Sequence, residues 1–183
     1  MNNSDQRIAQ CVFILVGLTL ATSVLGKRVE LLQGDLSLDV PSELSPGSQQ
    51  SEAPHDYDII GYLRSADRRV SVKVTYGKHD LDPKNLSAFL QEKVVDYSRL
   101  QKKLPHFRWL NHSIVDRSGR EWADISFAHG HMNTTKTEAY ARCLSCIAHR
   151  HLLEIWVVTH RMPDPGEKAL VDRIISSVRL RNA

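Results

Sequence analysis

The sequence predicts an α+β fold, in which an antiparallel β-sheet of about six to seven strands is flanked by helices as an α/β/α sandwich. Several short segments alternate apolar and polar residues, with turns of only a few residues between them. Strands joined by such short turns pair antiparallel. Two longer segments repeat their apolar residues with the period of an α-helix. Helices set apart from a mostly antiparallel sheet define the α+β class.

The composition is that of a folded domain. Of the 183 residues, 42% are hydrophobic and 25% are charged, and both fractions are ordinary for globular proteins. They exclude a disordered chain and a multi-span membrane protein. The net charge of +3 is too small to indicate nucleic-acid binding. The three cysteines are too few for a disulfide scaffold.

An apolar leader precedes the domain and is expected to be helical. Ile8 to Leu25 carries no charged side chain, and the small residues Ala21 and Ser23 lie where a signal peptidase would cut after Ser23. A cut after Gly26, with Val24 at the −3 position, is the second possibility. An uncleaved membrane anchor is the alternative, because the segment is nearly long enough to cross a bilayer core. We therefore assign residues 1–26 to a signal peptide or membrane anchor. Residues 27–183 then form a single exported domain, periplasmic or at the extracytoplasmic face of the membrane.

The first half of this domain predicts three strands and a helix. Asp35 to Val40 alternates apolar and polar residues and stops before a proline. Tyr57–Arg64 and Arg69–Tyr76 are rich in β-branched and aromatic residues, and a short polar turn between them predicts a hairpin. The apolar residues from Leu86 to Leu104 follow the helical period.

The second half predicts four strands and a final helix. The strands are expected at Phe107–Val115, Glu121–Ala128, Glu138–Ala148 and Leu152–Thr159. Asp164 is the expected N-cap of the helix, with Pro165 at its first position and Glu167 at the spacing of a capping box. The apolar stripe of this helix is expected at Leu170, Ile174 and Val178.

The turns between these strands predict which side chains share a face. A turn centred on Thr134 sets Ile125 opposite Cys143. A turn centred on Arg150 then sets Cys143 opposite Val157. One face is apolar under this register and suits a covering helix. The other face is mixed and collects Trp122, Asp124, Ser126, Arg142, Leu144, Cys146, Glu154, Trp156 and Val158.

The mixed face is the predicted contact surface. Tryptophan and arginine are enriched where proteins bind one another. We therefore predict Trp122, Arg142 and Trp156 as partner-binding residues, with a protein as the partner.

Cys143 and Cys146 have the spacing of a CxxC motif. Inside a strand, however, two such side chains point to opposite faces, with Cα atoms about 10 Å apart. An unstrained disulfide needs less than about 7 Å. No start signal for a helix follows that could activate the first thiol. We expect two packed thiols, and a disulfide at a β-bulge is the alternative.

The nine histidines raise the question of a metal site. The predicted register puts His149 and His151 at one turn, and His129, His131 and His160 near the opposite end of the sheet. These ends are roughly 30 Å apart at the strand rise, whereas the ligands of a structural zinc converge on one point. We predict no metal site and no cofactor, with a weak surface site at either cluster as the alternative.

No catalytic constellation is recognisable. The sequence contains no GxSxG, P-loop or GxGxxG motif. The predicted register does not bring Asp124 and Glu154 together as a carboxylate dyad. We assign no catalytic residue and predict that the protein is not an enzyme.

The order of elements resembles one known pattern. It is carried by the segment DLSLDVP from Asp35, the long helix from Leu86 to Leu104, the strand with Gly119-Arg120-Glu121-Trp122, the hairpin that ends in Leu153–Val157 and the helix that ends in Ile174–Arg179. Together these resemble the PsbP-like superfamily, which includes DcrB-type envelope proteins and Ran-binding Mog-type proteins. The resemblance covers about residues 29 to 180. It implies an antiparallel sheet flanked by helices, used mainly as a non-enzymatic binding scaffold.

These observations favour a non-enzymatic exported binding or adaptor domain of the cell envelope, membrane-associated where residues 1–26 are retained. Two other hypotheses stay open. One is a metal- or thiol-dependent envelope protein that uses Cys143, Cys146 and the histidines. The other is an exported immunity or inhibitor protein that acts against a toxin.

Overall fold

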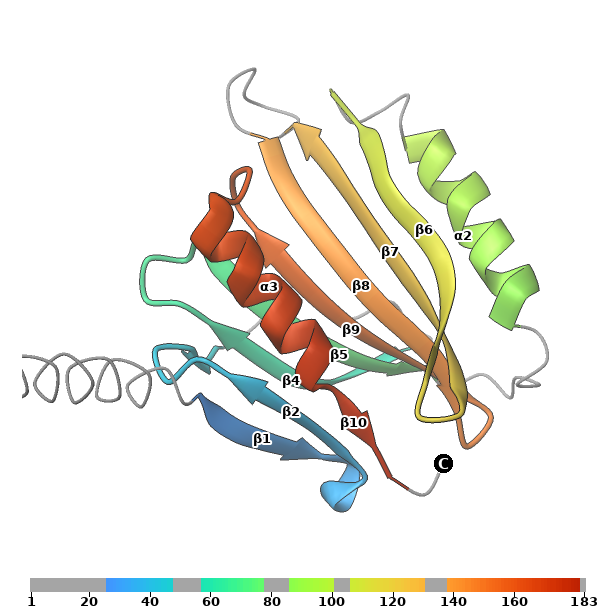
Figure 1. The fold of residues 1–183 in the computed structure, drawn as a ribbon, viewed down its shortest axis with the longest axis horizontal. Coiled ribbons are helices and arrows are strands. Elements are labelled where there is room, and N and C mark those ends of the chain that lie inside the picture. Colours follow the sequence, from blue (N-terminus) through green and yellow to red (C-terminus); the bar gives the residue numbers. More distant parts are fainter. Residues whose placement is uncertain (1–25, 48–56, 78–85, 101–105, 131–137, 182–183) are drawn as a thin grey trace, which may run out of the picture.

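A computed structural model describes residues 26–47, 57–77, 86–100, 106–130 and 138–181. The leader before Gly26, the turn at Thr134 and the predicted end of the first helix lie outside the described residues. The described chain forms two α-helices, α2 (Leu86–Leu100) and α3 (Pro165–Ser177), with strands in two antiparallel sheets (Figure 1). Neither helix is long and apolar enough to cross a membrane.

The larger sheet has seven strands in the order β3-β4-β5-β9-β8-β7-β6, and every pairing is antiparallel. The strands are β3 (Ser45–Pro46), β4 (Tyr57–Arg64), β5 (Val70–Gly77), β6 (Arg108–Arg117), β7 (Arg120–Gly130), β8 (Glu138–Ala148) and β9 (His151–Thr159). After β5 the chain passes through α2 to the far edge and returns as a meander, so that β9 lies beside β5. The α+β class is confirmed, as are the six strands predicted between Tyr57 and Thr159 and the presence of both helices.

A second, three-stranded sheet has the order β1-β2-β10. It contains β1 (Lys27–Leu31), β2 (Leu36–Val40) and β10 (Arg179–Leu180), with a short 3-10 turn, η1 (Leu32–Gly34), between the first two. The prediction of a single sheet was therefore wrong. Segments this short and charged carry no clear alternation, so β1 and β10 were not predictable; they pair because β2 offers them both of its edges.

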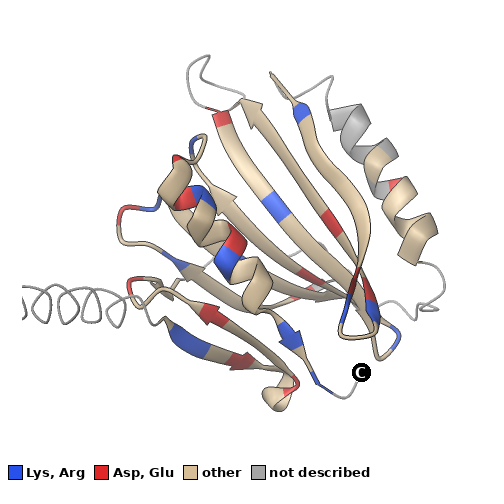
Figure 2. Cartoon of the chain, viewed as in Figure 1, with Lys and Arg blue, Asp and Glu red and all other residues tan. Residues whose placement is uncertain are grey.

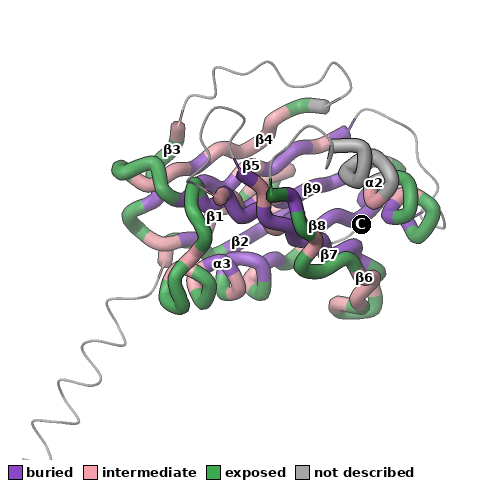
Figure 3. The backbone as a smooth tube through the Cα atoms, turned by 90° about the horizontal axis from the view of Figure 1, so that it is seen from above, coloured by how far each residue is buried: buried purple, intermediate pink, exposed green. Residues whose placement is uncertain are grey.

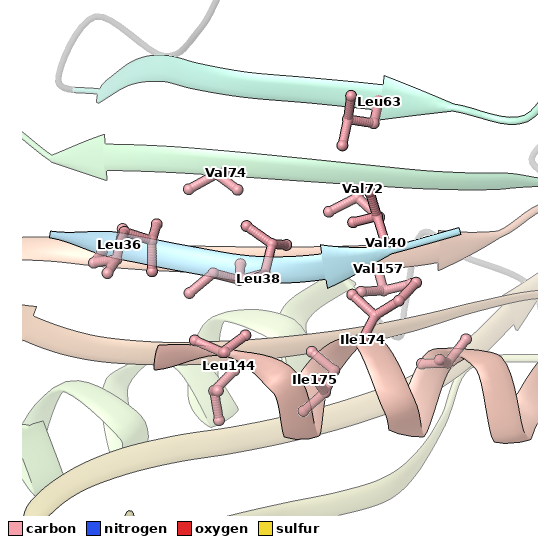
Figure 4. Close-up of a cluster of buried hydrophobic side chains, with 14 of the residues drawn as sticks. Leu36, Leu38, Val40, Leu63, Val72, Val74, Leu144, Val157, Ile174 and Ile175 are labelled. Carbon is pink, nitrogen blue, oxygen red and sulfur yellow. The ribbon is translucent and has the colours of Figure 1, made fainter. Parts of the chain in front are cut away.

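The small sheet and α3 together cover one face of the large sheet, here called the α3 face. Figure 4 shows β2 and α3 side by side over β5 and β9. The buried contacts include Leu36, Leu38, Val40, Val72, Val74, Leu144, Val157, Ile174 and Ile175. Each fully buried side chain of this size contributes about 1.5–3 kcal/mol relative to an exposed one. Gly61 of β4 permits the close approach of the two sheets, since a Cβ there would lie 2.9 Å from Leu31 Cδ1.

Helix α3 begins as its sequence predicts. The Asp164 side chain accepts a hydrogen bond from the Glu167 backbone N–H, and the Glu167 carboxylate accepts one from the Asp164 N–H. The predicted stripe is only partly correct. Within the helix, Val171, Ile174 and Ile175 are buried, whereas Leu170 is half-buried. Residues at this i, i+3, i+4 spacing share one face, and the sequence did not say which of two adjacent apolar residues turns inward.

Helix α2 covers the opposite face of the large sheet, here called the α2 face. Leu86 and Leu90 of the helix are buried against Ile125 of β7 and Cys143 and Ile147 of β8. Figure 3 shows that the buried residues are concentrated in the strands between the two helices. The helices thus flank the sheet as predicted, with the small sheet added to the layer of α3.

The predicted register is correct for one hairpin and wrong for the next. Ile125 lies opposite Cys143, as expected. Cys143 lies opposite Trp156 rather than Val157, because Ala148 pairs with His151 across a two-residue turn. Both turn residues, His149 and Arg150, have positive φ, at 48° and 66°. Turns of this kind normally carry Asn-Gly or Asp-Gly, so His-Arg gave no signal of it.

This one-residue shift moves every β9 side chain to the other face. Glu154, Trp156 and Val158 lie on the α2 face. Leu153, Ile155 and Val157 lie on the α3 face.

Candidate functional site

The three predicted partner-binding residues do not form one surface. Trp122 and Arg142 lie on the α3 face, whereas Trp156 lies on the α2 face, because of the register of β9. Trp122 is only 3% exposed and belongs to the main hydrophobic core. The grouping of Trp122, Arg142 and Trp156 on one mixed face is therefore corrected.

Arg142 is at the centre of an ion-pair network between the sheet and α3. Its Nε and Nη2 donate to the two carboxylate oxygens of Asp124, at 3.0 and 2.6 Å. Its Nη1 donates to Asp172 of α3, which also pairs with Lys168 at 2.8 Å. The hydrogen bonds to Asp124 raise the pKa of Arg142, so the guanidinium stays charged. Arg142 therefore ties the helix to the sheet.

Asp124 is nearly buried, with 7% of its side chain exposed. Asp124→Asn would leave the Arg142 charge without its bidentate partner, and breaking such a pair costs about 3 kcal/mol. We expect the free energy of unfolding in urea to fall by that amount. Lys168→Ala, which removes only an exposed ion pair, should cost less than about 0.5 kcal/mol. Equal effects of the two changes would contradict a stabilising role for the Arg142 network.

An aromatic cluster lies on the α2 face at one end of β6. Phe107, Trp109, Phe127 and Trp156 form it, and its ring centroids are 5.2 Å apart for Phe107 and Phe127 and 6.3 Å apart for Phe127 and Trp156. Phe107 and Phe127 are buried, whereas Trp109 and Trp156 are partly exposed. Of the three predicted residues, Trp156 alone belongs to this cluster.

The cluster reaches the edge of the large sheet. Trp109 comes from β6, the edge strand, and the register with β7 shifts immediately after it. Leu110, at this irregularity, is 47% exposed. Met162, which is 37% exposed, contacts Arg108 of the same strand at 3.8 Å. Sequence analysis did not assign Phe107 or Trp109 to the contact surface, although their alternation in the predicted strand Phe107–Val115 placed both on one face.

Cys143 and Cys146 point to opposite faces, as predicted. Cys143 packs beneath α2, and Cys146 belongs to the core beneath α3. They are not bonded to each other. Burial raises the pKa of Cys146 to about 12, against the opposing effect of Arg120. This thiol is therefore protonated and unreactive at neutral pH.

We expect both buried thiols to resist alkylation until the protein unfolds. In a Cys11→Ser variant, which removes the leader thiol, native protein at pH 8 should show no rapidly reacting thiol. After denaturation in guanidinium chloride it should show two. Rapid labelling of the native protein would contradict the packing described here, and failure to label after denaturation would indicate a disulfide.

The described histidines and carboxylates are dispersed. His149 lies in the β8–β9 turn and His151 directly follows it. His129 of β7 and His160 after β9 lie at the other end of the sheet, and His131 is outside the described residues. Among the residues that the structure describes, no group of three His, Cys, Asp or Glu side chains could hold a metal ion.

Asp124 and Glu154 lie on opposite faces of the sheet. Glu154 is 6% exposed on the α2 face, where Thr75 and Trp156 each donate a hydrogen bond to its carboxylate at 3.3 Å. Asp124 is bound by Arg142 on the α3 face. The two carboxylates therefore do not form a dyad.

Comparisons with known proteins identify the fold. No protein-family model and no curated protein sequence matches the chain. Cyanobacterial PsbP (CyanoP) from Synechocystis sp. PCC 6803 superimposes with a TM-score of 0.63 and 12% identity, over 86% of this chain and 93% of its own. The Ran-binding protein Mog1p of Saccharomyces cerevisiae superimposes with a TM-score of 0.57 and 14% identity, over 86% and 96%.

A third solved structure is also similar. LpqN, involved in cell envelope biogenesis of Mycobacterium tuberculosis, has a TM-score of 0.54 and 14% identity, over 85% of this chain and 90% of its own. The chain is thus an α+β domain built on a meandering antiparallel sheet with a helix on each face. More particularly, it has the PsbP-like/Mog1 fold, as the sequence resemblance implied.

Proposed function

We propose that this protein is a non-enzymatic, exported binding or adaptor domain of the cell envelope that binds a protein partner through its aromatic cluster. The observation that carries the proposal is a pair of partly exposed tryptophans in one aromatic cluster, Trp109 from the edge strand β6 and Trp156 from the inner strand β9. Partner binding by a protein of this fold is illustrated by the Ran-binding Mog1p, and a role in the envelope by LpqN.

The chemistry of the surface suits a protein partner. Aromatic residues, methionine and arginine are the types enriched at protein interfaces. Trp109 and Trp156 supply rigid apolar area. The two most exposed large hydrophobic residues of the described chain, Leu110 and Met162, lie beside the same end of β6. A partner that covers this end of the α2 face would remove the exposed parts of Trp109 and Trp156 from water.

Trp156 alone of the three residues expected from sequence stays in the proposed contact surface. Trp122 is in the core, and truncating a buried tryptophan costs about 3–5 kcal/mol. Loss of binding by Trp122→Ala would therefore report unfolding. Arg142 is committed to Asp124 and Asp172. In the described part of the chain, no observation favours a metal- or thiol-dependent protein, or an immunity protein against a toxin, over this proposal.

Export can be tested by fractionating cells of the native host that express the chain with a C-terminal tag. We expect the protein in the extracytoplasmic fraction. Its first residue should lie in the region from 24 to 27 when the leader is cleaved, or the intact chain should remain in the membrane when it is an anchor. Intact chain in the soluble cytoplasmic fraction would contradict the proposed export.

Partner binding can be tested by chemical crosslinking in the same cells, followed by quantification of co-purified proteins. Trp156→Ala should reduce recovery of the specific partner by about tenfold or more, as expected when an interface hot spot is truncated. The matched control is Arg173→Ala, an exposed position on the outer side of α3, which should leave recovery unchanged. Equal recovery with both variants would remove the aromatic cluster from the proposal.

A further inference from the structure

A basic cavity lies at the other end of the β6–β7 hairpin from the aromatic cluster. Its volume is about 490 Å³, and it lies between the hairpin, the end of α3 and β10. Arg117 and Arg120 enter it from the two strands of the hairpin and Arg179 from β10, while Trp122 forms part of its wall. Figure 2 shows basic residues at the hairpin and in β10 on the same side of the molecule.

Two of the three arginines are held in place by the end of α3. Arg117 Nη1 donates to the Ile175 carbonyl at 2.7 Å. Arg179 Nη1 donates to the carbonyls of Ser176 and Val178, at 2.7 and 2.9 Å. These bonds use one nitrogen of each guanidinium. In the described part of the chain, no carboxylate forms an ion pair with Arg117 or Arg179.

The nearby acidic groups are engaged elsewhere. The Asp124 carboxylate accepts hydrogen bonds from Nε and Nη2 of Arg142. Asp116 accepts a hydrogen bond from the Gly119 N–H within the hairpin turn. Among the described residues, no acidic side chain lines the cavity. Burial lowers the pKa of Arg117, and the charges of Arg142 and Arg179 add to that effect against the influence of Asp124. The cavity thus brings together three guanidinium groups, of which Arg117 and Arg179 form no ion pair with a described carboxylate.

Stabilisation of the α3 C-terminus does not explain the whole arrangement. A cation there compensates the negative end of the helix dipole, which accounts for Arg117 and Arg179. The side chain of Arg120 interacts with the buried thiol of Cys146. Three guanidinium groups from three separate strands therefore converge on one cavity, where one or two would suffice for capping.

We propose that this cavity binds the phosphate group of a small phosphorylated molecule or of a lipid headgroup. Arginine binds phosphate oxygens through paired N–H groups, and its charge persists at all physiological pH values. The size of the cavity is in the range of small-molecule sites. The apolar side chains of Val178 and Leu180, with the Trp122 ring, line the remainder and would contact the group that carries the phosphate.

A second basic cavity of about 440 Å³ provides an internal comparison. It is lined by Arg64, Arg68 and His160, but Asp67 also lines it. Asp67 pairs with Arg69 at 3.2 Å and accepts a hydrogen bond from Ser65. A carboxylate in the lining opposes the entry of an anion, so we assign no phosphate site there.

The test is a titration of the purified full-length chain with inorganic phosphate at constant ionic strength, followed by calorimetry and tryptophan fluorescence. We expect saturable binding. Arg120→Gln and Arg179→Gln should each weaken it by about tenfold or more, the effect of losing a charge-assisted hydrogen bond. Arg68→Gln, which removes the same charge at the second cavity, should leave the affinity unchanged. Far-UV circular dichroism establishes whether each variant is folded. If Arg120→Gln does not fold, the test rests on Arg179→Gln.

Two further arms identify the source of the phosphate. Glycerol 3-phosphate tests a soluble ligand. Phosphatidylcholine vesicles with and without phosphatidylglycerol test a lipid headgroup. Binding in either arm that Arg120→Gln abolishes supports the site. Absence of saturable binding in every arm, or an equal loss with Arg68→Gln, would overturn it.

Discussion

The inner strand β8 must be apolar on both faces, and the rest of the architecture follows from that requirement. Most of its residues from Ala139 to Ala148 are buried. Because neither face can be left in water, the chain covers one with α2 and the other with α3 and the small sheet. Arg142 is the charged exception on this strand. It is compatible with the core only because Asp124 and Asp172 satisfy its guanidinium from the sheet and the helix.

The two proposed sites occupy opposite ends of one pair of strands. Trp109 lies near the start of β6 and Arg117 at its end, so the sites are about 25 Å apart at the strand rise. A protein partner and a phosphate-bearing ligand could therefore be bound together without competing. An adaptor requires this separation, since it must hold two things at once. The aromatic cluster packs beside Leu86 and Leu90 of α2, and the basic cavity borders the end of α3, so each helix also supports one proposed site.

Much of the fold was predictable from local pattern. The long strands and α3 were correctly placed, because each has a clear period or a capping signal such as that of Asp164 and Glu167. The short strands β1, β3 and β10 were not, since their pairing depends on neighbours distant in sequence. The site was less predictable. His149 and Arg150 both have positive φ, which their residue types do not predict. The length of this turn sets the register of β9 and therefore the face on which Trp156 lies. The arginines of the basic cavity are far apart in sequence, and only the fold brings them together.

The position of β10 has a consequence for the order in which the molecule matures. In the chain, β2 precedes every strand of the large sheet, whereas β10, one of its two partners, follows all of them and comes directly after α3. While those residues are still inside the ribosome, Leu38, Val72 and Val157 have no complete cover. A nascent chain thus keeps part of this hydrophobic surface exposed until α3 and β10 have both been synthesised and have docked. Pairing of β10 with β2 is the contact between distant segments that completes the small sheet over that surface.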